Sequence, residues 1–383
     1  MTSQPTTVWI ERLQLTGFRS YASLDLALGP ECVVLSGPNG AGKTNLMEAV
    51  SLLAPGPGLR RAAYADMARV GGAGDWTVSA IVRNGETATR IGTSAGGAAR
   101  IVRIDGVNRT PAALAEHLEV LWVTPAMDGL FTGPASDRRR FLDKLIAGFE
   151  PSYRTRIGQF ERAMRQRNRA LEDDGTAAAL LSGLELQMAE LGVAIAAARR
   201  AAVSQLAATI AARTAAAPAS PFPWAMLELA GRLEQDLASR PAVDVEDAYA
   251  RTLRDMRPRD RAAARTLEGP HLSDLEVGHG PKAMPARLCS TGEQKALLIN
   301  LVLGHAVLLK ARRGGAAPIL LLDEIAAHLD SARRAALFSE LLTLGSQAWL
   351  TGTDPEPFYP LESRAKLLGI ADGIVSVAGR SVL

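Results

Sequence analysis

Residues 33–50, VVLSGPNGAGKTNLMEAV, decide the fold of this chain. They contain Gly37-Pro38-Asn39-Gly40-Ala41-Gly42-Lys43-Thr44, a complete match to the phosphate-loop pattern G-x-x-x-x-G-K-[ST]. The apolar residues before the loop predict a buried strand, and residues 45–50 predict a helix. Backbone N–H groups of such a loop point at phosphate oxygens, and the positive end of the following helix adds to the attraction. The pattern therefore predicts an α/β nucleotide-binding fold in which Lys43 contacts the β- and γ-phosphates and Thr44 binds Mg²⁺. The alternative is a glycine-rich turn that binds nothing.

Two adjacent carboxylates predict a second part of the same site. Asp323 and Glu324 follow the apolar run in LLLDEIAAHLD, residues 320–330. Carboxylates at the C-terminal end of a parallel strand lie where α/β sheets bind ligands. We therefore expect Asp323 to hold Mg²⁺ and Glu324 to orient or deprotonate the attacking water, so that Glu324 and Lys43 are the catalytic residues. The alternative is that both acids only begin a helix, since acids are favoured near a helix N-terminus.

A third motif, LCSTGEQKALLINLVLGHA, residues 288–306, precedes the acidic strand. Ser290 and Glu293 match the capping box S-x-x-E. Ser290 and Gly292 would also present a hydroxyl and a backbone N–H to a phosphate. Both interpretations can hold together. The apolar run in this motif is shorter than a membrane span, and it predicts a buried helix.

The composition predicts a globular intracellular protein. The 383 residues are 47% hydrophobic and carry a formal net charge of +3, and most of the 43 basic residues are arginines. Cys32 and Cys289 are too few for a disulfide framework or a cysteine metal site, which favours a reducing cytoplasm. The N-terminus does not have the pattern of an ordinary signal peptide.

In the rest of the chain, the alternation of apolar residues and two turn signals predict strands and hairpins. Strands are expected at 8–18 and 23–37, and Asn84-Gly85 and Asp105-Gly106 predict antiparallel hairpins. Residues 134–215 have a helical pattern. We therefore expect one ATPase head split in sequence by a mostly helical lobe. Its expected parts are 1–132 with the phosphate loop and antiparallel strands, 133–267 as the lobe, and 268–383 with the remaining motifs.

Together the motifs resemble a known family. Four further segments carry the resemblance: LTGFRSYASLDL at 15–26, GPASDRRRFLD at 133–143, GPHLSDL at 269–275 and TGTDPEPF at 351–358. In this order, with the motifs above, the chain resembles the ATP-binding-cassette ATPases that act on DNA, and most closely the RecF family of recombination mediators. The likeness spans nearly the whole chain. It implies a cassette-type head with a mixed sheet and an antiparallel β subdomain.

The resemblance also implies a function. Family members are weak DNA-stimulated ATPases of the cytoplasm that act in DNA repair, replication and the response to DNA damage. ATP and Mg²⁺ would close two copies face to face, with each nucleotide between the phosphate loop of one subunit and the Ser290–Gly292 signature of the other. The dimer would act at gapped DNA and at junctions of single and double strands. With RecR and RecO it would help RecA replace single-strand-binding protein.

The resemblance also implies roles for individual residues at the matching positions of each motif. Arg19 resembles the family arginine near the nucleotide, Asp330 the aspartate that crosses the dimer interface, and Thr353 occupies the place of a γ-phosphate sensor. Relatives often have a metal-sensing glutamine near LWVTPAMDGLF, residues 121–131, where this chain has none. Leu121, Trp122 or Asp128 could occupy that neighbourhood. Leu272 stands where relatives usually have arginine.

Arginines cluster in the expected lobe, where they are candidates for contacts to DNA phosphates. The candidates are Arg138, Arg139, Arg140, Arg154 and Arg156, followed by Arg162, Arg165, Arg167 and Arg169. The alternative is a solvated helix face with glutamates as local partners. No aromatic ladder accompanies the arginines, which favours duplex or junction backbone over a stacking platform.

A DNA repair ATPase has two rivals as the function of this chain. The first is the ATPase subunit of a membrane transporter, which usually carries a switch histidine where this chain has TGTD. The second is a long-armed chromosome ATPase, whose coiled coils need many more heptads than the lobe can hold. The resemblance implies DNA and a second copy of the chain as partners, with no membrane.

Overall fold

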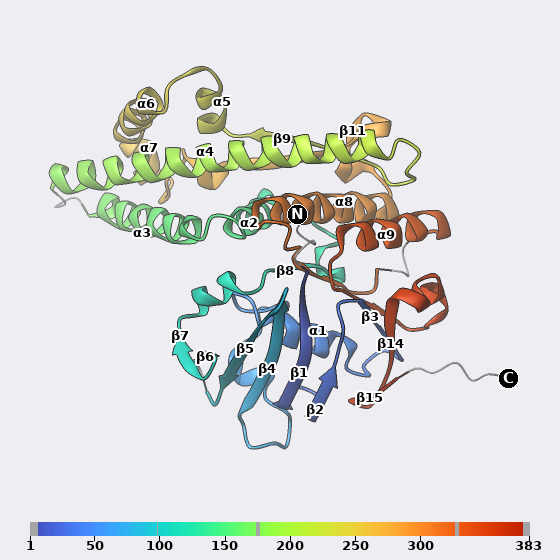
Figure 1. Cartoon of the computed structure of the whole chain (residues 1–383). Coiled ribbons are helices and arrows are strands. Elements are labelled where there is room, and N and C mark those ends of the chain that lie inside the picture. Colours follow the sequence, from blue (N-terminus) through green and yellow to red (C-terminus); the bar gives the residue numbers. More distant parts are fainter. Residues whose placement is uncertain (1–6, 98, 174–176, 326–328, 378–383) are drawn as a thin grey trace. The chain divides into compact units, whose positions relative to one another are not determined.

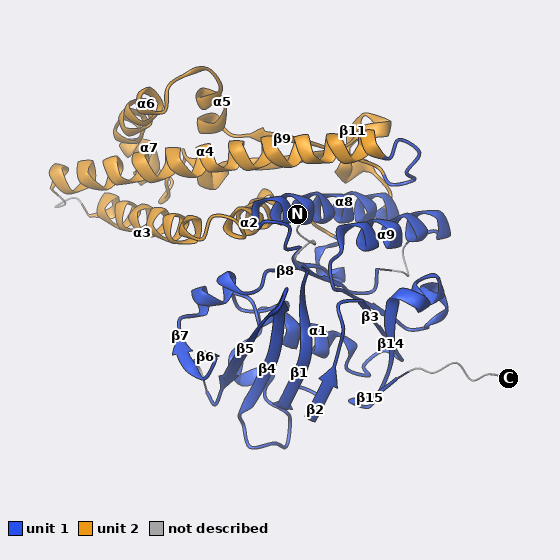
Figure 2. Ribbon diagram, viewed as in Figure 1, with its two compact units in different colours: residues 1–128, 217–222, 291–383 blue, residues 129–216, 223–290 orange. Residues whose placement is uncertain are grey.

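The computed structural model describes residues 7–97, 99–173, 177–325 and 329–377. The described chain forms two compact units, each assembled from separate segments (Figure 2). Unit 1 comprises residues 1–128, 217–222 and 291–383, and unit 2 comprises residues 129–216 and 223–290. The chain therefore leaves and re-enters each unit.

A six-stranded, mostly parallel sheet forms the base of the nucleotide motifs in unit 1. Its strand order is β15-β14-β3-β13-β12-β8, and β15 is the antiparallel member. The bounds are β15 Ile374–Val377, β14 Ala365–Ala371, β3 Cys32–Ser36, β13 Ala348–Gly352, β12 Ile319–Leu322 and β8 Val120–Val123. β3 and β12 are buried at every residue, as apolar strands covered on both faces should be. The carboxyl ends of the parallel strands share one edge of the sheet, where ligands bind in α/β folds.

An antiparallel sheet is the second layer of unit 1 (Figure 1). Its order is β2-β1-β4-β5-β6-β7, with bounds Tyr21–Ala27, Val8–Phe18, Trp76–Asn84, Thr87–Ala95, Ile101–Ile104 and Val107–Arg109. Both predicted hairpins are confirmed, and Asp105 and Gly106 have the positive φ angles of 48° and 82° that a tight turn needs. The strand expected over 23–37 is wrong, because the chain breaks at Gly29-Pro30 and supplies β2 to one sheet and β3 to the other.

Helices complete unit 1. The α-helices are α1 Lys43–Ser51, α8 Thr291–Arg312 and α9 Ser331–Leu344, and the 3-10 helices are η1 Tyr64–Met67, η2 Pro111–Glu116, η3 Pro125–Met127 and η8 Glu356–Arg364. One apolar core joins the two sheets and α1, with Phe18, Trp76 and Trp349 among its largest side chains. α1 thus begins at the phosphate loop and is anchored in the core.

Unit 2 is built around α4, a helix of 39 residues that packs against α3, α5 and α6. Its elements are α2 Ala135–Ala147, α3 Ser152–Glu172, α4 Ala178–Ala216, β9 Ala225–Ala230, α5 Arg232–Ser239, α6 Ala242–Asp255, α7 Arg257–Ala262, η4 Pro270–Leu272, β10 Asp274–His279, η5 Gly280–Lys282, β11 Met284–Pro285 and η6 Ala286–Leu288. β10 pairs with β9 along its whole length. For this reason the boundary of the unit falls at 290/291 and not at 267/268.

Two described helices, α4 and α8, are long and apolar enough to cross a membrane by length and composition alone. The apolar window of α4 is 44% buried within the structure. In α8 the most apolar window is 78% buried, and the predicted buried helix is confirmed. α4 carries the buried charges Glu185 and Arg199, each in an ion pair inside unit 2. Paired charges of this kind fit a protein interior better than lipid.

Candidate functional site

Glycines shape the phosphate loop at positions where a side chain would be strained. Gly37 has φ +150°, and an added Cβ would lie 2.1 Å from the carbonyl oxygen of Ile370. Gly42 has φ +113°, and its Cβ would lie 2.8 Å from Oγ of Ser20. Both angles lie in the region that side chains disfavour. Between these two glycines, Pro38, Asn39 and Gly40 are exposed.

Lys43, the first residue of α1, lies inside this loop and is 5% exposed. Its Nζ donates hydrogen bonds to the carbonyl oxygens of Gly37 at 2.6 Å and Pro38 at 2.9 Å. Burial lowers the pKa of Lys43, while the negative charges of Glu324 and Asp323 act in the opposite direction. The loop therefore holds a desolvated cation, the environment in which an ammonium group attracts a phosphate most strongly.

Thr44 and Asp323 meet across 279 residues of sequence. The Thr44 hydroxyl lies 3.3 Å from Oδ1 and 3.2 Å from Oδ2 of the Asp323 carboxylate, which is 4% exposed. One hydroxyl and one carboxylate are the protein donors that Mg²⁺ takes when phosphate oxygens and waters complete its octahedron. The described residues contain no group of three or more His, Cys, Asp or Glu side chains suited to a metal. This donor set fits a nucleotide-bound Mg²⁺.

Glu324 has an unusual backbone conformation beside Asp323. Its φ is +52°, in the left-handed region that costs free energy for a residue with a side chain. Its N–H donates a 2.7 Å hydrogen bond to the hydroxyl of Thr351. The same hydroxyl donates a 2.7 Å hydrogen bond to Oδ1 of Asp323. Thr351 is the first residue of the TGTDPEPF segment, but sequence analysis assigned no role to it.

Thr353, the residue carried over as a phosphate sensor, lies next to the phosphate loop. Its carbonyl oxygen accepts a 3.2 Å hydrogen bond from the N–H of Gly37. Its exposed hydroxyl donates to Oδ2 of Asp354 at 3.0 Å. The backbone of Thr353 therefore supports the loop, and its side chain is at the surface.

Arg19 contacts the helix that follows the phosphate loop. Its guanidinium forms two hydrogen bonds with the Glu48 carboxylate, at 2.9 and 3.0 Å, and a third with the carbonyl oxygen of Asp66 at 2.7 Å. Glu48 is fully buried in α1 and also pairs with Arg60 at 3.2 Å. The pairing places Arg19 beside α1 and neutralises a buried charge in that helix.

The signature residues lie at the start of α8. Ser290 directly precedes the helix and is exposed, and Gly292 is half-buried in its first turn. Asp330 caps α9 by accepting a 2.8 Å hydrogen bond from the N–H of Arg333, and its side chain is 57% exposed. Residues 326–328 of the LLLDEIAAHLD motif lie outside the described residues.

The carboxyl end of β8 lies beside the acidic strand. Leu121 and Trp122 pair with Leu320 and Leu321 inside the sheet, so both lie before the point where the two strands end. The next residue of the acidic strand, Asp323, donates its N–H to the carbonyl oxygen of Val123. Thr124, which follows β8 directly, is 5% exposed.

Asp128, the third candidate for the metal-sensing position, pairs with the buried ammonium group of Lys295 in α8 at 3.5 Å. That contact lies within unit 1 and gives Asp128 a structural partner.

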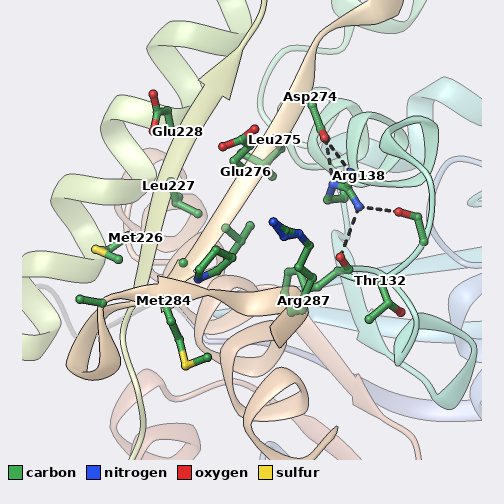
Figure 3. Close-up of a pocket in the computed structure, with 16 residues that line it drawn as sticks. Thr132, Arg138, Met226, Leu227, Glu228, Asp274, Leu275, Glu276, Met284 and Arg287 are labelled. Atoms are coloured by element: carbon green, nitrogen blue, oxygen red, sulfur yellow. Dashed lines mark hydrogen bonds and ion pairs between the residues drawn. The ribbon is translucent and has the colours of Figure 1, made fainter. Parts of the chain in front are cut away.

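Several arginines predicted to contact DNA have partners inside unit 2. Arg138 forms an ion pair with Asp274 at the wall of a cavity of about 440 Å³ (Figure 3). Arg139 donates to the carbonyl oxygen of Ser273 at 2.6 Å, and burial lowers its pKa. Arg156 pairs with Glu150 at 2.9 Å, and the exposed Arg140 with Asp137 at 2.6 Å.

The interpretation of Arg167 as a DNA contact is wrong. Its side chain is 0% exposed, and its guanidinium bonds Glu185 at 3.1 Å and Asp260 at 2.6 Å. It also donates to the carbonyl oxygen of Leu253 at 2.6 Å. Arg167 thus links α3 to α4 and α7 within the core of unit 2.

Four exposed arginines share one face of α3: Arg154, Arg162, Arg165 and Arg169. At 3.6 residues per turn, they fall within an arc of about 80° around the helix. Arg165 has a partner on this face, Glu161 at 3.8 Å, with both side chains more than half exposed. Exposed pairs of this kind contribute little to stability. The face is available for phosphate contacts.

Comparisons with known proteins agree with this geometry. The model of the RecF/RecN/SMC N-terminal domain family matches residues 9–359. The DNA replication and repair protein RecF of Mesorhizobium japonicum is 53% identical over 376 residues, covering 97% of this chain and 98% of the relative. The protein of that name from Rhizobium etli is 52% identical, covering 97% of this chain and 99% of the relative.

Solved structures share the fold. The recombination mediator protein RecF-ATPrS of the RecFOR pathway superposes with a TM-score of 0.84 and 20% identity, covering 99% of this chain and 100% of that one. An Smc head domain with an extended coiled coil from Pyrococcus furiosus gives 0.55 and 16% identity, covering 97% and 96%. The predicted cassette-type ATPase head with a helical region in the middle is confirmed.

Proposed function

Because this chain belongs to the RecF family, within the wider RecF/RecN/SMC group, we propose that it is a recombination mediator that binds ATP and acts on DNA in replication and repair. The observation that carries this proposal is the meeting of Thr44 with Asp323, which assembles the phosphate loop and the acidic strand into one site. The relatives are DNA replication and repair proteins, so the ATPase subunit of a transporter is not favoured.

Each residue of the site has a chemical task in ATP hydrolysis. The loop N–H groups and Lys43 bind the triphosphate, and the Thr44 hydroxyl and Asp323 carboxylate hold Mg²⁺. When bound there, Mg²⁺ would neutralise negative charge on the transferred phosphoryl group. Glu324 orients the attacking water and accepts its proton, which a carboxylate within hydrogen-bond reach can do. Arg19 keeps α1 in place through Glu48.

We infer that the active form is an ATP-closed homodimer. Ser290 and Gly292 at the exposed start of α8 would contact the γ-phosphate bound by a second copy, since a helix N-terminus favours anions. Asp330 would lie at the dimer interface, and Thr353 would detect the γ-phosphate from beside Gly37. The exposure of Ser290 and Asp330 supports this assignment.

The exposed face of α3 is the proposed contact to DNA backbone. Arg154, Arg162, Arg165 and Arg169 carry no base-specific geometry, which suits gapped duplex and junctions of single and double strands. RecR and RecO are proposed partners, because the structural relatives are described as members of the RecFOR pathway. The proposed role is to help RecA load onto single strands covered by single-strand-binding protein, in the cytoplasm.

Hydrolysis rate against DNA structure is the test of this function. The rate should be slow without DNA and should rise most with gapped duplex, less with intact duplex or single strands, and the stimulation should decrease with salt. Lys43→Ala is the control that removes phosphate binding. Equal rates with and without every DNA would contradict a DNA-stimulated ATPase.

A further inference from the structure

We propose that Thr351 is a positioning residue that holds both Asp323 and Glu324 in the arrangement required for hydrolysis. This inference rests on the proposed ATPase function and extends it to a residue outside the phosphate loop, signature and acidic motifs. Thr351 acts through the two acids and touches neither nucleotide nor water in this assignment.

Thr351 lies between the two strands that carry the site. In β13 it pairs with Leu35 of β3, two residues before the phosphate loop begins, and the preceding Leu350 pairs with Leu322 of β12. Its side chain is fully buried at 0% exposure. The hydroxyl therefore emerges at the sheet edge where the loop and the acids meet.

One hydroxyl group bonds the carboxylate of Asp323 and the backbone N–H of Glu324. It donates to Oδ1 of Asp323 at 2.7 Å and accepts from the N–H of Glu324 at 2.7 Å. A hydroxyl has one donor hydrogen and two acceptor lone pairs, so both bonds can form at once. Because threonine is β-branched, its χ1 angle is restricted and the hydroxyl direction is fixed by the strand.

The first bond orients the carboxylate of Asp323. Oδ1 is engaged by Thr351, so rotation of the carboxylate would break a short hydrogen bond in a buried site. Oδ2 receives no bond from Thr351 and lies 3.2 Å from the Thr44 hydroxyl. A ligand whose orientation is set by a neighbouring hydrogen bond binds metal more tightly, and loss of such a neighbour typically costs about 10–100-fold in affinity or activity.

The second bond anchors the strained residue. Glu324 has φ +52°, and such conformations persist only where surrounding contacts hold them. Removing the hydroxyl would leave the Glu324 N–H without this partner and allow the backbone to relax. The Glu324 carboxylate would then leave the position from which it can orient water.

A purely structural hydroxyl would behave differently. Thr93 in β5 is also buried, at 1% exposure, and accepts a 2.7 Å hydrogen bond from Nε of Arg100 away from the acids. Thr93→Val therefore matches Thr351→Val in size and burial but changes no contact of Asp323 or Glu324. The two variants separate loss of a buried hydrogen bond from loss of positioning.

The experiment compares wild type, Thr351→Val, Thr351→Ser and Thr93→Val by three measurements. Amide hydrogen exchange at Glu324 is measured in the metal-free protein, affinity for a fluorescent ATP analogue is measured with Mg²⁺ and with EDTA, and kcat is measured with gapped DNA. In Thr351→Val we expect exchange at Glu324 to accelerate at least about tenfold, and kcat to fall about 10–100-fold. The gain in affinity from Mg²⁺ should shrink about tenfold, while affinity in EDTA stays unchanged. Thr351→Ser should restore most of each property.

Normal exchange at Glu324 together with an unchanged Mg²⁺ gain in Thr351→Val would overturn the proposal, as would the same changes in Thr93→Val. Should the valine variant not fold, Thr351→Cys takes its place, because a thiol is a weak donor and acceptor and the same directions are expected. If wild-type protein hydrolyses no ATP, the proposed function fails, whereas exchange at Glu324 still decides the role of Thr351.

Discussion

The Arg138 guanidinium and the Asp274 carboxylate form two parallel hydrogen bonds, from Nε to Oδ1 at 2.8 Å and from Nη2 to Oδ2 at 2.6 Å. The hydrogen bonds to Asp274 raise the pKa of Arg138. A third bond joins Arg138 to the carbonyl oxygen of Gly133 at 2.6 Å. This residue therefore ties α2 to β10, and its guanidinium is committed within unit 2.

Arg138→Ala should lower the free energy of unfolding by about 1–3 kcal/mol, because it removes charge-assisted bonds and leaves a half-buried carboxylate without its partner. Urea denaturation measures the change. Arg140→Ala, a neighbour on the exposed side of α2, is the matched control and should stay within about 0.5 kcal/mol of wild type. Equal stability of both variants would mean that the Asp274 pair contributes nothing.

Arg154→Ala combined with Arg162→Ala should weaken binding to DNA of every sequence and flatten the salt dependence by about one unit per lost phosphate contact. Both side chains are exposed on the same face of α3, so stability should change little. Titration of a labelled gapped duplex at several salt concentrations gives the slope. A slope equal to that of wild type would assign the arginines to a solvated helix face.

Glu324→Gln should bind ATP and Mg²⁺ and stop hydrolysis, because it keeps the shape of the side chain and removes the base. We expect it to accumulate as an ATP-bound dimer. Light scattering with ATP measures the mass, and phosphate release measures turnover. Turnover at the wild-type rate would remove Glu324 from its assigned role.

Ser290→Asp separates a helix cap from a contact to a second subunit. Aspartate is also a good cap, so the melting temperature should not change, whereas removing a cap altogether costs about 1 kcal/mol. A carboxylate facing the γ-phosphate of another subunit would be repelled, so the variant should bind ATP as a monomer and neither dimerise nor hydrolyse. ATP affinity, melting temperature and mass are measured on one preparation. A normal dimer with normal turnover would leave Ser290 only a cap.

His271 should make stability depend on pH. Burial lowers its pKa, the nearby charges of Arg139 and Arg199 lower it further, and the Thr266 carbonyl and Asp260 oppose the change. The unfolded chain therefore takes up the proton first, near its ordinary pKa of about 6.5. The contribution of neutral His271 to the free energy of unfolding is fully present above about pH 6.5. It is lost as the pH falls, by up to about 1.4 kcal/mol per pH unit.

Urea denaturation of wild type and His271→Gln between about pH 7.5 and about pH 5.5 measures this effect. The difference in unfolding free energy between the two proteins should change across this range, because glutamine does not titrate. Parallel curves would show that the histidine does not carry the dependence.

Those residues of the nucleotide site that belong to local sequence motifs could be predicted. Gly37 and Gly42 are favoured by their backbone angles. Lys43, Thr44 and Asp323 belong to motifs that are expected to meet where the parallel strands of an α/β sheet end. The role of Thr351 could not be predicted, because it depends on the strand order β3-β13-β12, which no local sequence pattern contains. Thr353 was chosen by analogy and lies two residues further along, just after β13, where its side chain is exposed.

The arginines show the same limit. The helical period places Arg154 and Arg167 on different faces of α3, but it does not show which face is buried. The partners that decide this, Asp260 and Glu185, lie 93 and 18 residues from Arg167 in the sequence. Long-range ion pairs of this kind become visible only when the packing of α3 against its neighbours is known.

The interleaving of the two units has a consequence for synthesis of the chain. β3, which leads into the phosphate loop, lies between β13 and β14 in the sheet, and both of these strands come after residue 347. During synthesis, the apolar strand β3 therefore remains without its neighbouring strands until the whole of unit 2 has been made. Unpaired strand edges and distant contacts slow folding and invite aggregation, so this period is where chaperones would act. A ribosome stalled before residue 348 would carry the phosphate-loop sequence without the sheet that shapes it.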